Sequence, residues 1–355
     1  MVSEKIIFLT ITKPGYSRSW TYFNGIKKLG LDAEFIKIDS RNLINEFRRI
    51  KKQVSRTNIF VVMSPSQYLV PFVRLFFGRK VYLDAGWSLF EATVISRKRF
   101  GLFGWLAVKN YFIDWIASLL AKKIILESKS QKNFYCKLFL VPRRKCYVLY
   151  TGVDEESFQV DRYFVMPPDF FNNSKIVLFR GKYNSESGIE ILAEATRLLK
   201  NEQITFWVFS PGLPSKVKFS NNTFVSREFL PDGNIPGLVE ACSISLGQLA
   251  KHSRLNRTIP HKAFESAYLA KPYLSARNKG IIEIFEEGRE VLLFTPGNSM
   301  ELANEIKRLI NNQALAMELS QSIFKKYNKN LSQKILAKEF LKVLNLEEKI
   351  PLTSI

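Results

Sequence analysis

Basic side chains gather around the start of a predicted helix in the segment 256–274, NRTIPHKAFESAYLAKPYL. Pro260 suits the first position of that helix, because the N–H that proline lacks would have no partner there. Pro272 ends the helix, because the residue before a proline avoids the α region. The helix start carries Arg254, Arg257, His261 and Lys262. Free N–H groups and the helix dipole both attract anions, so this segment predicts an anion-binding site.

The charge of the chain is concentrated in its first half. Residues 1–150 hold 27 Lys and Arg against 9 Asp and Glu, a net charge of +18 out of +21 for all 355 residues. A basic half indicates a polyanionic partner for that half, either an anionic membrane or a nucleic acid. No helix-turn-helix, zinc-finger or RNP signature occurs in 1–150, so we expect a membrane and no nucleic acid.

Cysteine and histidine usage excludes several kinds of site. The three cysteines are widely spaced and form no CxxC pair, which argues against a disulfide framework or a zinc site and fits a reducing cytoplasm. With only two histidines in the chain, we expect no metal centre.

Short apolar runs alternate with amphipathic stretches along the whole chain, a pattern typical of parallel sheets with helical crossovers. Two such series meet near MPPDFFNNS (166–174). We therefore predict an α/β protein with two doubly wound, Rossmann-like domains that face each other across a cleft, at 1–165 and 166–332. The C-terminal helical segment 333–355 can pack back on the first domain. Ligands of such sheets bind at the carboxyl ends of the strands.

The stretch RKRFGLFGWLAVKNYFIDWIASLLAKK (97–123) is the strongest membrane signal. It is too polar to span a bilayer, but basic ends and interfacial aromatic residues are typical of segments that lie in the membrane interface. The residues expected to contact the membrane or acceptor are Arg97, Lys98, Arg99, Trp105 and Trp115. A buried domain helix with solvated ends is the alternative interpretation.

Four segments, taken in order, resemble the signatures of one enzyme family. They are TGVDEESF (151–158), GKYNSESGIEILAEA (181–195), IPHKAFESAYLAKPYL (259–274) and NKGIIEIFEEGREVLLFTPGNSMELANEI (278–306). Together they resemble the retaining GT-B glycosyltransferases of the glycosyltransferase group 1 family, of the type that builds bacterial polysaccharides and lipid-linked glycans. The resemblance implies the GT-B fold, with the donor bound by the second domain.

The resemblance implies a phosphate-binding loop at 181–188, where the family has G-R-x-x-x-x-K-G. Gly181 keeps the pattern, Lys182 replaces the usual arginine, and Ser187 replaces the lysine. Arg180, just before the loop, can supply the missing charge. Arg180 and Lys182 are therefore expected to stabilise the diphosphate leaving group, and a surface role is the alternative.

The helix at 260–272 is implied to contact the nucleotide. Glu265 matches the second of two family glutamates and is expected to bind the ribose hydroxyls, with Ala270-Lys271-Pro272 in place of the family's Gly-x-Pro. The first glutamate is replaced by Arg257, so sugar recognition must differ. The other donor-binding candidates that the resemblance implies are Pro260, His261, Lys262, Gly280 and Glu283. The alternatives are solvated side chains and a plain strand-to-helix loop.

Two candidates lie in the first domain. Gly15, in KPGYSRS (13–19), follows the first strand where the family has a glycine-bearing loop facing the donor phosphates. Asp84, in LDAGWSLF (83–90), is either a base that orients the acceptor hydroxyl or a capping residue.

The function expected from these features is a retaining, metal-independent hexosyltransferase of bacterial cell-surface glycan synthesis. It would move a sugar from a nucleotide-diphosphate sugar, with a UDP-sugar favoured on family frequency, to a lipid-linked or polysaccharide acceptor. No cofactor is expected, and we expect the protein in the cytoplasm, attached peripherally to the inner face of the plasma membrane. The alternative is a non-catalytic GT-B relative that serves as a scaffold or partner subunit.

Overall fold

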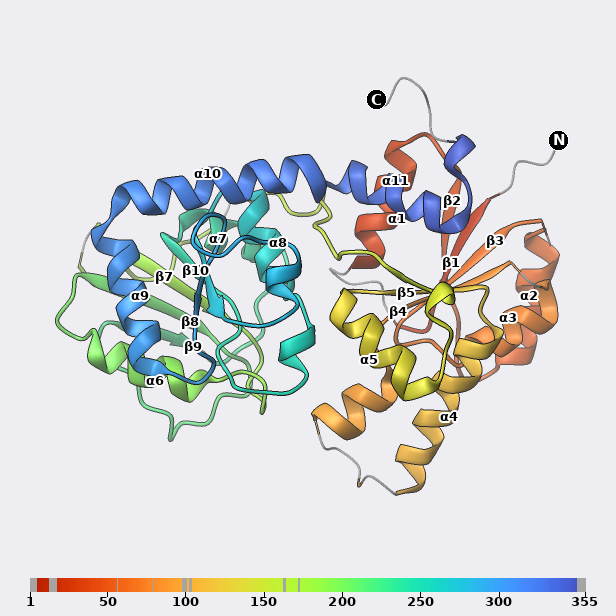
Figure 1. The fold of residues 1–355 in the computed structure, drawn as a ribbon, viewed down its shortest axis with the longest axis horizontal. Coiled ribbons are helices and arrows are strands. Elements are labelled where there is room, and N and C mark those ends of the chain that lie inside the picture. The colour runs from red at the N-terminus through yellow and green to blue at the C-terminus, as the bar shows by residue number, and fades with distance from the viewer. Residues whose placement is uncertain are drawn as a thin grey trace. The chain divides into compact units, whose positions relative to one another are not determined.

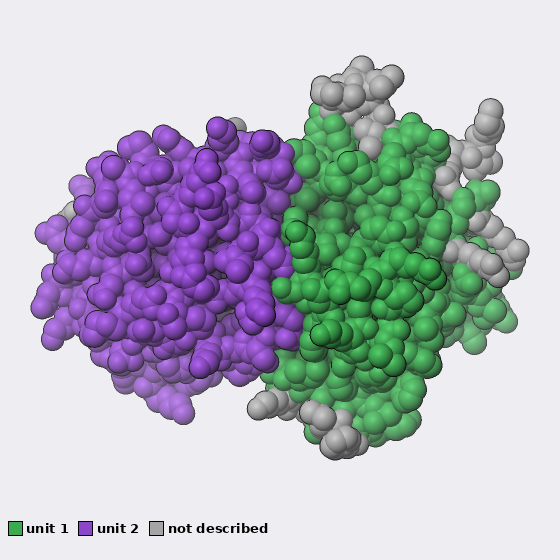
Figure 2. Space-filling model, in the orientation of Figure 1, with its two compact units in different colours: residues 1–154, 333–355 green, residues 155–332 purple. Residues whose placement is uncertain are grey.

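The computed structural model describes residues 5–12, 18–55, 57–78, 80–97, 101, 104–161, 164–171 and 173–349. They form two compact units: residues 1–154 with 333–355 make unit 1, and residues 155–332 make unit 2 (Figure 2). The composition of the sequence predicts a domain boundary after residue 165, whereas the units divide after Asp154. The segment that follows is held in unit 2 by bonds such as Tyr327 Oη to Glu155 Oε1, at 2.9 Å.

Unit 1 is built on a parallel six-stranded sheet with the order β2-β1-β3-β4-β5-β6 (Figure 1). Its strands are β1 (Ile6–Thr10), β2 (Ala33–Lys37), β3 (Ile59–Met63), β4 (Val81–Gly86), β5 (Lys123–Leu126) and β6 (Cys146–Val148). Its helices are α1 (Arg18–Lys28), α2 (Leu43–Gln53), α3 (Leu69–Phe77), α4 (Trp105–Leu120), α5 (Lys129–Phe139) and α11 (Gln333–Leu344). Short helical turns are η1 (Glu91–Ser96, a π-helix), η2 (Arg143–Lys145) and η5 (Glu347–Lys349).

The alternating side chains of β1 show why this sheet is buried on both faces. Ile7 and Leu9 pack into one hydrophobic cluster, and Ile6 and Phe8 pack into another. Successive residues of a strand point to opposite faces, so both faces need a helical cover. The second cluster is completed from α11, where Phe340 stacks on Phe8 with ring centroids 5.8 Å apart. The C-terminal helix is therefore part of the core of unit 1.

Unit 2 repeats the plan with the strand order β12-β11-β10-β7-β8-β9, again all parallel. Its strands are β7 (Lys175–Arg180), β8 (Ile204–Phe209), β9 (Thr223–Ser226), β10 (Ile244–Leu246), β11 (Tyr273–Ala276) and β12 (Leu292–Phe294). Its helices are α6 (Ile189–Leu198), α7 (Asn234–Ala241), α8 (His261–Tyr268), α9 (Ser299–Asn311) and α10 (Gln313–Asn330), with the turns η3 (Leu255–Arg257) and η4 (Ile281–Glu283).

The predicted α/β class with two doubly wound, Rossmann-like domains is confirmed. The cleft between the domains stays a prediction. In the part of the chain that the structure describes, no helix combines the length and the apolar character needed to cross a membrane.

Candidate functional site

The donor-site candidates of unit 2 converge at the carboxyl ends of β7 and β10. Arg180 is the last residue of β7, and Gly247 directly follows β10. Pro260 lies just before α8 in an extended conformation (φ −68°, ψ 143°), so the helix itself begins at His261. The site therefore forms where parallel strands end and a helix starts, as expected for this architecture.

Arg180 and Glu265 form a buried ion pair. Nη2 of Arg180 donates to Oε2 of Glu265, and the two side chains are 10% and 3% exposed. The pair ties the end of β7 to the second turn of α8. The family resemblance implies separate contacts of Arg180 with phosphate and of Glu265 with ribose, whereas in the structure the two side chains bond to each other. Those ligand contacts stay predictions.

Lys262 lies beside this pair, and its amine is buried against a carbonyl oxygen and an aromatic ring. Its Nζ donates to the carbonyl oxygen of Gly247 at 3.2 Å and lies 4.3 Å from the centroid of the Phe179 ring. Burial lowers the pKa of Lys262, the Arg180 charge adds to this, and Glu265 opposes it, leaving the pKa at about 7. A bound anion would favour the charged amine, so ligand binding and protonation are coupled at this position.

A cavity of about 180 Å³ opens beside these groups. Its lining residues are Phe179, Gly181, Lys182, Asn184, Glu186, Ser187, Gly247, Gln248, Leu255, Pro260 and Lys262. We call it the phosphate cavity. Lys182 is exposed, with its Nζ 5.7 Å from the centroid of the Phe229 ring. The structure thus brings Gly181, Lys182, Pro260 and Lys262 together at one cavity, and their contacts with a donor stay predictions.

The loop 181–188 is fixed by contacts that local sequence patterns do not reveal. Ser187, in place of the family lysine, is buried and donates to the carbonyl oxygen of Asn184 at 2.8 Å. Glu186 forms a 2.7 Å ion pair with Arg254 from the loop after β10. Gly188 has a φ of +64°, and a Cβ there would lie 2.5 Å from the amide nitrogen of Ala250, so glycine is required.

The remaining donor candidates surround the site without lining the phosphate cavity. His261 is the half-buried first residue of α8, and Glu283 is half-buried in η4. Gly280 packs so closely on the carbonyl oxygen of Thr258 that a Cβ would lie 2.6 Å from it. Sequence reasoning missed Gly247, Gln248 and Leu255 as lining residues. Gly247 had one usable signal, a glycine at the end of an apolar run.

In unit 1, Asp84 forms a closed ion pair with Arg18. Both carboxylate oxygens of Asp84 accept from Arg18, at 2.9 Å from Nε and 2.7 Å from Nη2, and Nη1 donates to Leu149 O at 2.9 Å. Asp84 is buried, and its oxygens are committed to this partner. The arrangement favours a structural role, and the role as a base stays a prediction. Gly15 lies outside the described residues.

The membrane candidates divide between exposed and packed positions. Trp105, the first residue of α4, is 77% exposed, whereas Trp115 packs against the core of unit 1. Arg97 is exposed, and Lys98 and Arg99 lie outside the described residues. Further exposed apolar side chains on α4 are Leu106, Val108, Phe112, Ile116 and Leu119. The helix therefore has both a packed face and an exposed apolar face.

Residues 174–312 match the sequence profile of the family "Glycosyl transferases group 1". Among curated proteins, no sequence matches the chain. In the described part of the chain, no group of three or more His, Cys, Asp and Glu side chains is placed to hold a metal ion.

Solved structures resemble the whole fold. HepE of Anabaena, solved with UDP-glucose, superposes with a TM-score of 0.69 at 16% identity over 97% of this chain and 100% of that chain. Sucrose-phosphate synthase of Thermosynechococcus elongatus gives 0.71 at 11% identity, over 97% and 98% of the two chains. TarM of S. aureus, solved with fondaparinux, alpha-GlcNAc-glycerol and UDP, gives 0.59 at 15% identity, over 84% and 58%. The chain thus has the GT-B fold, and its residues 174–312 are similar to the glycosyltransferase group 1 family.

Proposed function

We propose that this protein is a retaining, metal-independent glycosyltransferase that uses a UDP-sugar. The single observation that carries the proposal is the phosphate cavity, where Lys182 and Lys262 meet the start of α8 within the family-matched region. Cationic side chains and free helix N–H groups stabilise the charge that develops on a departing diphosphate. The UDP and UDP-glucose complexes of HepE support uridine as the base.

In the proposed reaction, the bond between the anomeric carbon and the diphosphate oxygen breaks, and the diphosphate leaves with the electron pair. The acceptor hydroxyl oxygen forms the new bond on the same face, and its proton passes to the departing phosphate oxygen. No protein nucleophile is needed. Lys262, with its pKa at about 7, is suited to become fully charged as the negative charge develops nearby.

The acceptor is proposed to be a lipid-linked or polysaccharide glycan at the cytoplasmic face of a bacterial plasma membrane. The support is the net charge of +18 on residues 1–150 together with the exposed apolar side chains of α4. Trp105 and Phe112 can enter the interface of an anionic leaflet while basic side chains contact its headgroups. Binding to vesicles with and without an anionic lipid, at low and high salt, tests this part.

The donor part is tested by thermal unfolding with UDP, GDP or ADP. A nucleotide at 100 times its Kd stabilises the folded state by about 2.7 kcal/mol, which gives a clear rise in Tm. UDP is expected to give this rise, and transfer from a UDP-sugar to an isolated membrane fraction should follow. If UDP binds and no sugar is ever transferred, the non-catalytic scaffold replaces the enzyme; if no nucleotide binds, the donor site itself is wrong.

A further inference from the structure

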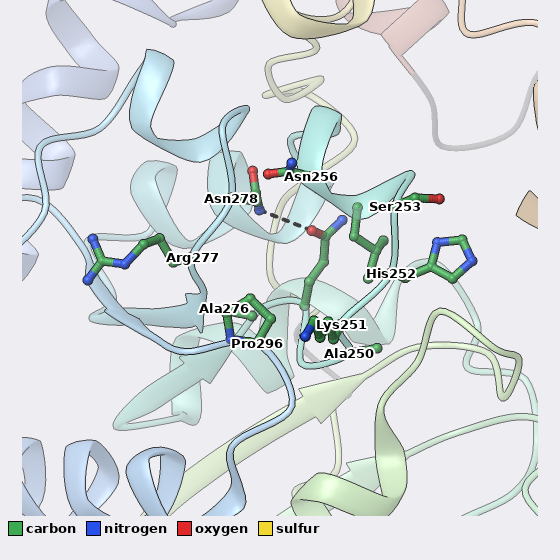
Figure 3. A pocket seen from close by; sticks show the side chains of 11 residues that line it. Ala250, Lys251, His252, Ser253, Asn256, Ala276, Arg277, Asn278 and Pro296 are labelled. Carbon is green, nitrogen blue, oxygen red and sulfur yellow. Dashed lines mark hydrogen bonds between the residues drawn. The ribbon is translucent and has the colours of Figure 1, made fainter.

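Unit 2 has cavities at both edges of its sheet. A cavity of about 570 Å³ is formed by the loops that follow β10, β11 and β12 (Figure 3). It shares Gln248 and Leu255 with the phosphate cavity, so it belongs to the site already described. Another cavity, of about 350 Å³, lies between α10 and the segment 286–290 and shares no lining residue with the phosphate cavity. This segment leads into β12, so it lies at the amino edge of the parallel sheet, whereas the donor site lies at the carboxyl edge.

The residues that line the cavity at the amino edge are all polar or charged. Those of α10 are spaced three or four positions apart and therefore form one stripe on the helix. None of the lining residues, all within the described ranges, is apolar, so an acyl chain or a nucleobase finds no surface on which to pack. We call this the α10 cavity. Its lining residues are Glu286, Arg289, Glu290, Ser322, Lys325, Lys326, Lys329 and Asn330.

Lys325 and Lys329 give the α10 cavity positive charge that can hold an anion. Both side chains are exposed and lie one turn apart on α10, and in the described part of the chain neither forms an ion pair. Like charges at this spacing repel each other, so an anion bound between them relieves the repulsion. Ser322 and Asn330 add a hydroxyl donor and an amide donor to the same stripe. A phosphate group can accept hydrogen bonds from all of these donors.

Two glutamates line the α10 cavity from a loop of fixed shape. The Glu290 amide donates to the Glu286 carbonyl oxygen at 2.8 Å, and Oε2 of Glu290 accepts from the Glu286 amide at 2.9 Å. Nη1 of Arg289 donates to Oε2 of Glu286 at 3.1 Å, and Nζ of Lys326 lies 4.0 Å from Oε1 of Glu290. An ionised carboxylate has about four lone-pair sites, so both glutamates can still accept from hydroxyl groups. Because carboxylates repel a phosphate but bind hydroxyls, the two segments suit the two ends of one ligand.

We propose that the α10 cavity binds a phosphorylated polyol, with the phosphate at Lys325 and Lys329 and the hydroxyls at Glu286 and Glu290. The volume of about 350 Å³ leaves room for more than a bare phosphate ion and lies in the range of ligand pockets. The ligand is either a soluble sugar phosphate or the glycerol phosphate headgroup of a lipid, which share this chemistry. The inference concerns a second site and does not rest on the proposed function.

The test uses the full-length chain and a double variant, Lys325→Gln with Lys329→Gln, which removes the charge and keeps much of the side-chain length. The matched control is Lys200→Gln with Lys216→Gln. It removes the same charge from two exposed lysines of unit 2 that line neither the α10 cavity nor the phosphate cavity. A third variant, Glu286→Gln, alters only the hydroxyl side of the α10 cavity. All titrations contain saturating UDP, which keeps the ligand out of the phosphate cavity.

In the soluble arm, calorimetry measures the Kd of glucose 6-phosphate, inorganic phosphate and glucose. We expect the wild type to bind glucose 6-phosphate most tightly and glucose most weakly. The Lys325 and Lys329 double variant should weaken both phosphate ligands about tenfold, and the control should stay within about twofold of the wild type. Glu286→Gln should weaken glucose 6-phosphate about threefold relative to inorganic phosphate. In the lipid arm, the same proteins are added to phosphatidylcholine vesicles with and without phosphatidylglycerol.

The arm in which the Lys325 and Lys329 double variant loses binding identifies the source of the ligand. Equal losses in this variant and in its control would overturn the inference, because binding would then follow net charge alone. Inorganic phosphate that binds as tightly as glucose 6-phosphate would overturn it too, and so would unchanged binding in both arms. These results leave the proposed function standing. A wild-type protein that binds no UDP removes the proposed function instead, and the comparison of the two double variants still tests the α10 cavity.

Discussion

Each unit holds a buried arginine–carboxylate pair at the carboxyl end of its sheet, and the two pairs differ in how fully the arginine is used. Arg18 in unit 1 donates hydrogen bonds from Nε and Nη2 to Asp84 and from Nη1 to the carbonyl oxygen of Leu149. Arg180 in unit 2 contacts Glu265 through Nη2, its charge acts on Lys262, and its chain neighbours Phe179 and Gly181 line the phosphate cavity. A saturated guanidinium holds a fold together, whereas a guanidinium with N–H groups to spare can also serve a ligand.

The largest expected effect is on the closed pair of unit 1. Asp84→Ala leaves the buried Arg18 charge without its partner, and breaking such a pair costs about 3–5 kcal/mol of unfolding free energy. Urea unfolding measures this loss, and UDP affinity of the folded fraction should not change. A well-folded Asp84→Ala protein that has lost less than about 1 kcal/mol and all transferase activity would instead favour the role of Asp84 as a base.

For the Arg180–Glu265 pair of unit 2, the expected effect is mainly on ligand binding. Glu265→Gln keeps the shape and a hydrogen-bond acceptor for Arg180 but removes the charge, and losing one charged hydrogen bond to the ligand weakens binding by about 1.5–3 kcal/mol. UDP affinity should thus fall at least tenfold by calorimetry. The matched change Asp84→Asn in unit 1 should leave UDP affinity unchanged. Equal losses of affinity in both variants would remove the contrast between the pairs.

Lys262, beside the Arg180–Glu265 pair, makes the stability of unit 2 depend on pH. Its pKa falls from 10.5 to about 7 on folding, so between these values the unfolded chain binds more protons than the folded one. The Lys262 contribution to stability therefore rises with pH from about 7 to 10.5, and its cost is largest below pH 7. Lys262→Met should stabilise the ligand-free protein more at pH 6.5 than at pH 9.5 in urea unfolding. A stability difference that does not vary with pH would show that the amine is charged in the fold throughout.

The smallest expected effect concerns the end of the helix that carries Lys262 and Glu265. Ala270 has a φ of +52°, a left-handed conformation that costs a residue with a Cβ about 1 kcal/mol, which explains the glycine in the family pattern. Ala270→Gly should stabilise the protein by about 0.5 kcal/mol once the extra freedom of the unfolded chain is subtracted. Leu140 in unit 1 has the same φ, so Leu140→Gly is the matched change, and Tm compares the two. A fall in Tm for both would mean that the backbone freedom of glycine outweighs the relief of strain.

Sequence patterns predicted the positions of strands and helices well, but they did not predict which distant residues form ion pairs. The apolar runs 5–11 and 175–181 contain β1 and β7, because a buried parallel strand must be apolar along its length. Lys182 and Lys262 were expected from the family resemblance, and they line one cavity in the structure because parallel strands end at the same edge of a sheet. The Arg18–Asp84 and Glu186–Arg254 pairs join residues 66 and 68 positions apart, and no local pattern connects such partners.

The predicted domain boundary differed for a similar reason. The Pro- and Asn-rich segment 166–174 has the composition of a linker, yet Trp207 Nε1 donates to the carbonyl oxygen of Pro168 at 2.9 Å within unit 2. Asp154, in the segment 151–158, likewise accepts from the distant residues Asn24 and Gln333. Composition indicates whether a segment tends to form a loop, but contacts with residues far away in the chain determine the domain in which it packs.

The place of α11 in unit 1 has a consequence for how the protein is made. Phe8 and Tyr22 both stack on Phe340, so the core of unit 1 needs a residue more than 300 positions later in the chain. During synthesis, domains generally fold in order from the N-terminus. The apolar side chains of unit 1 that α11 covers therefore stay exposed until all of unit 2 has been translated. The first unit to be translated is therefore the last to finish folding, and it is the one that depends on protection in the meantime.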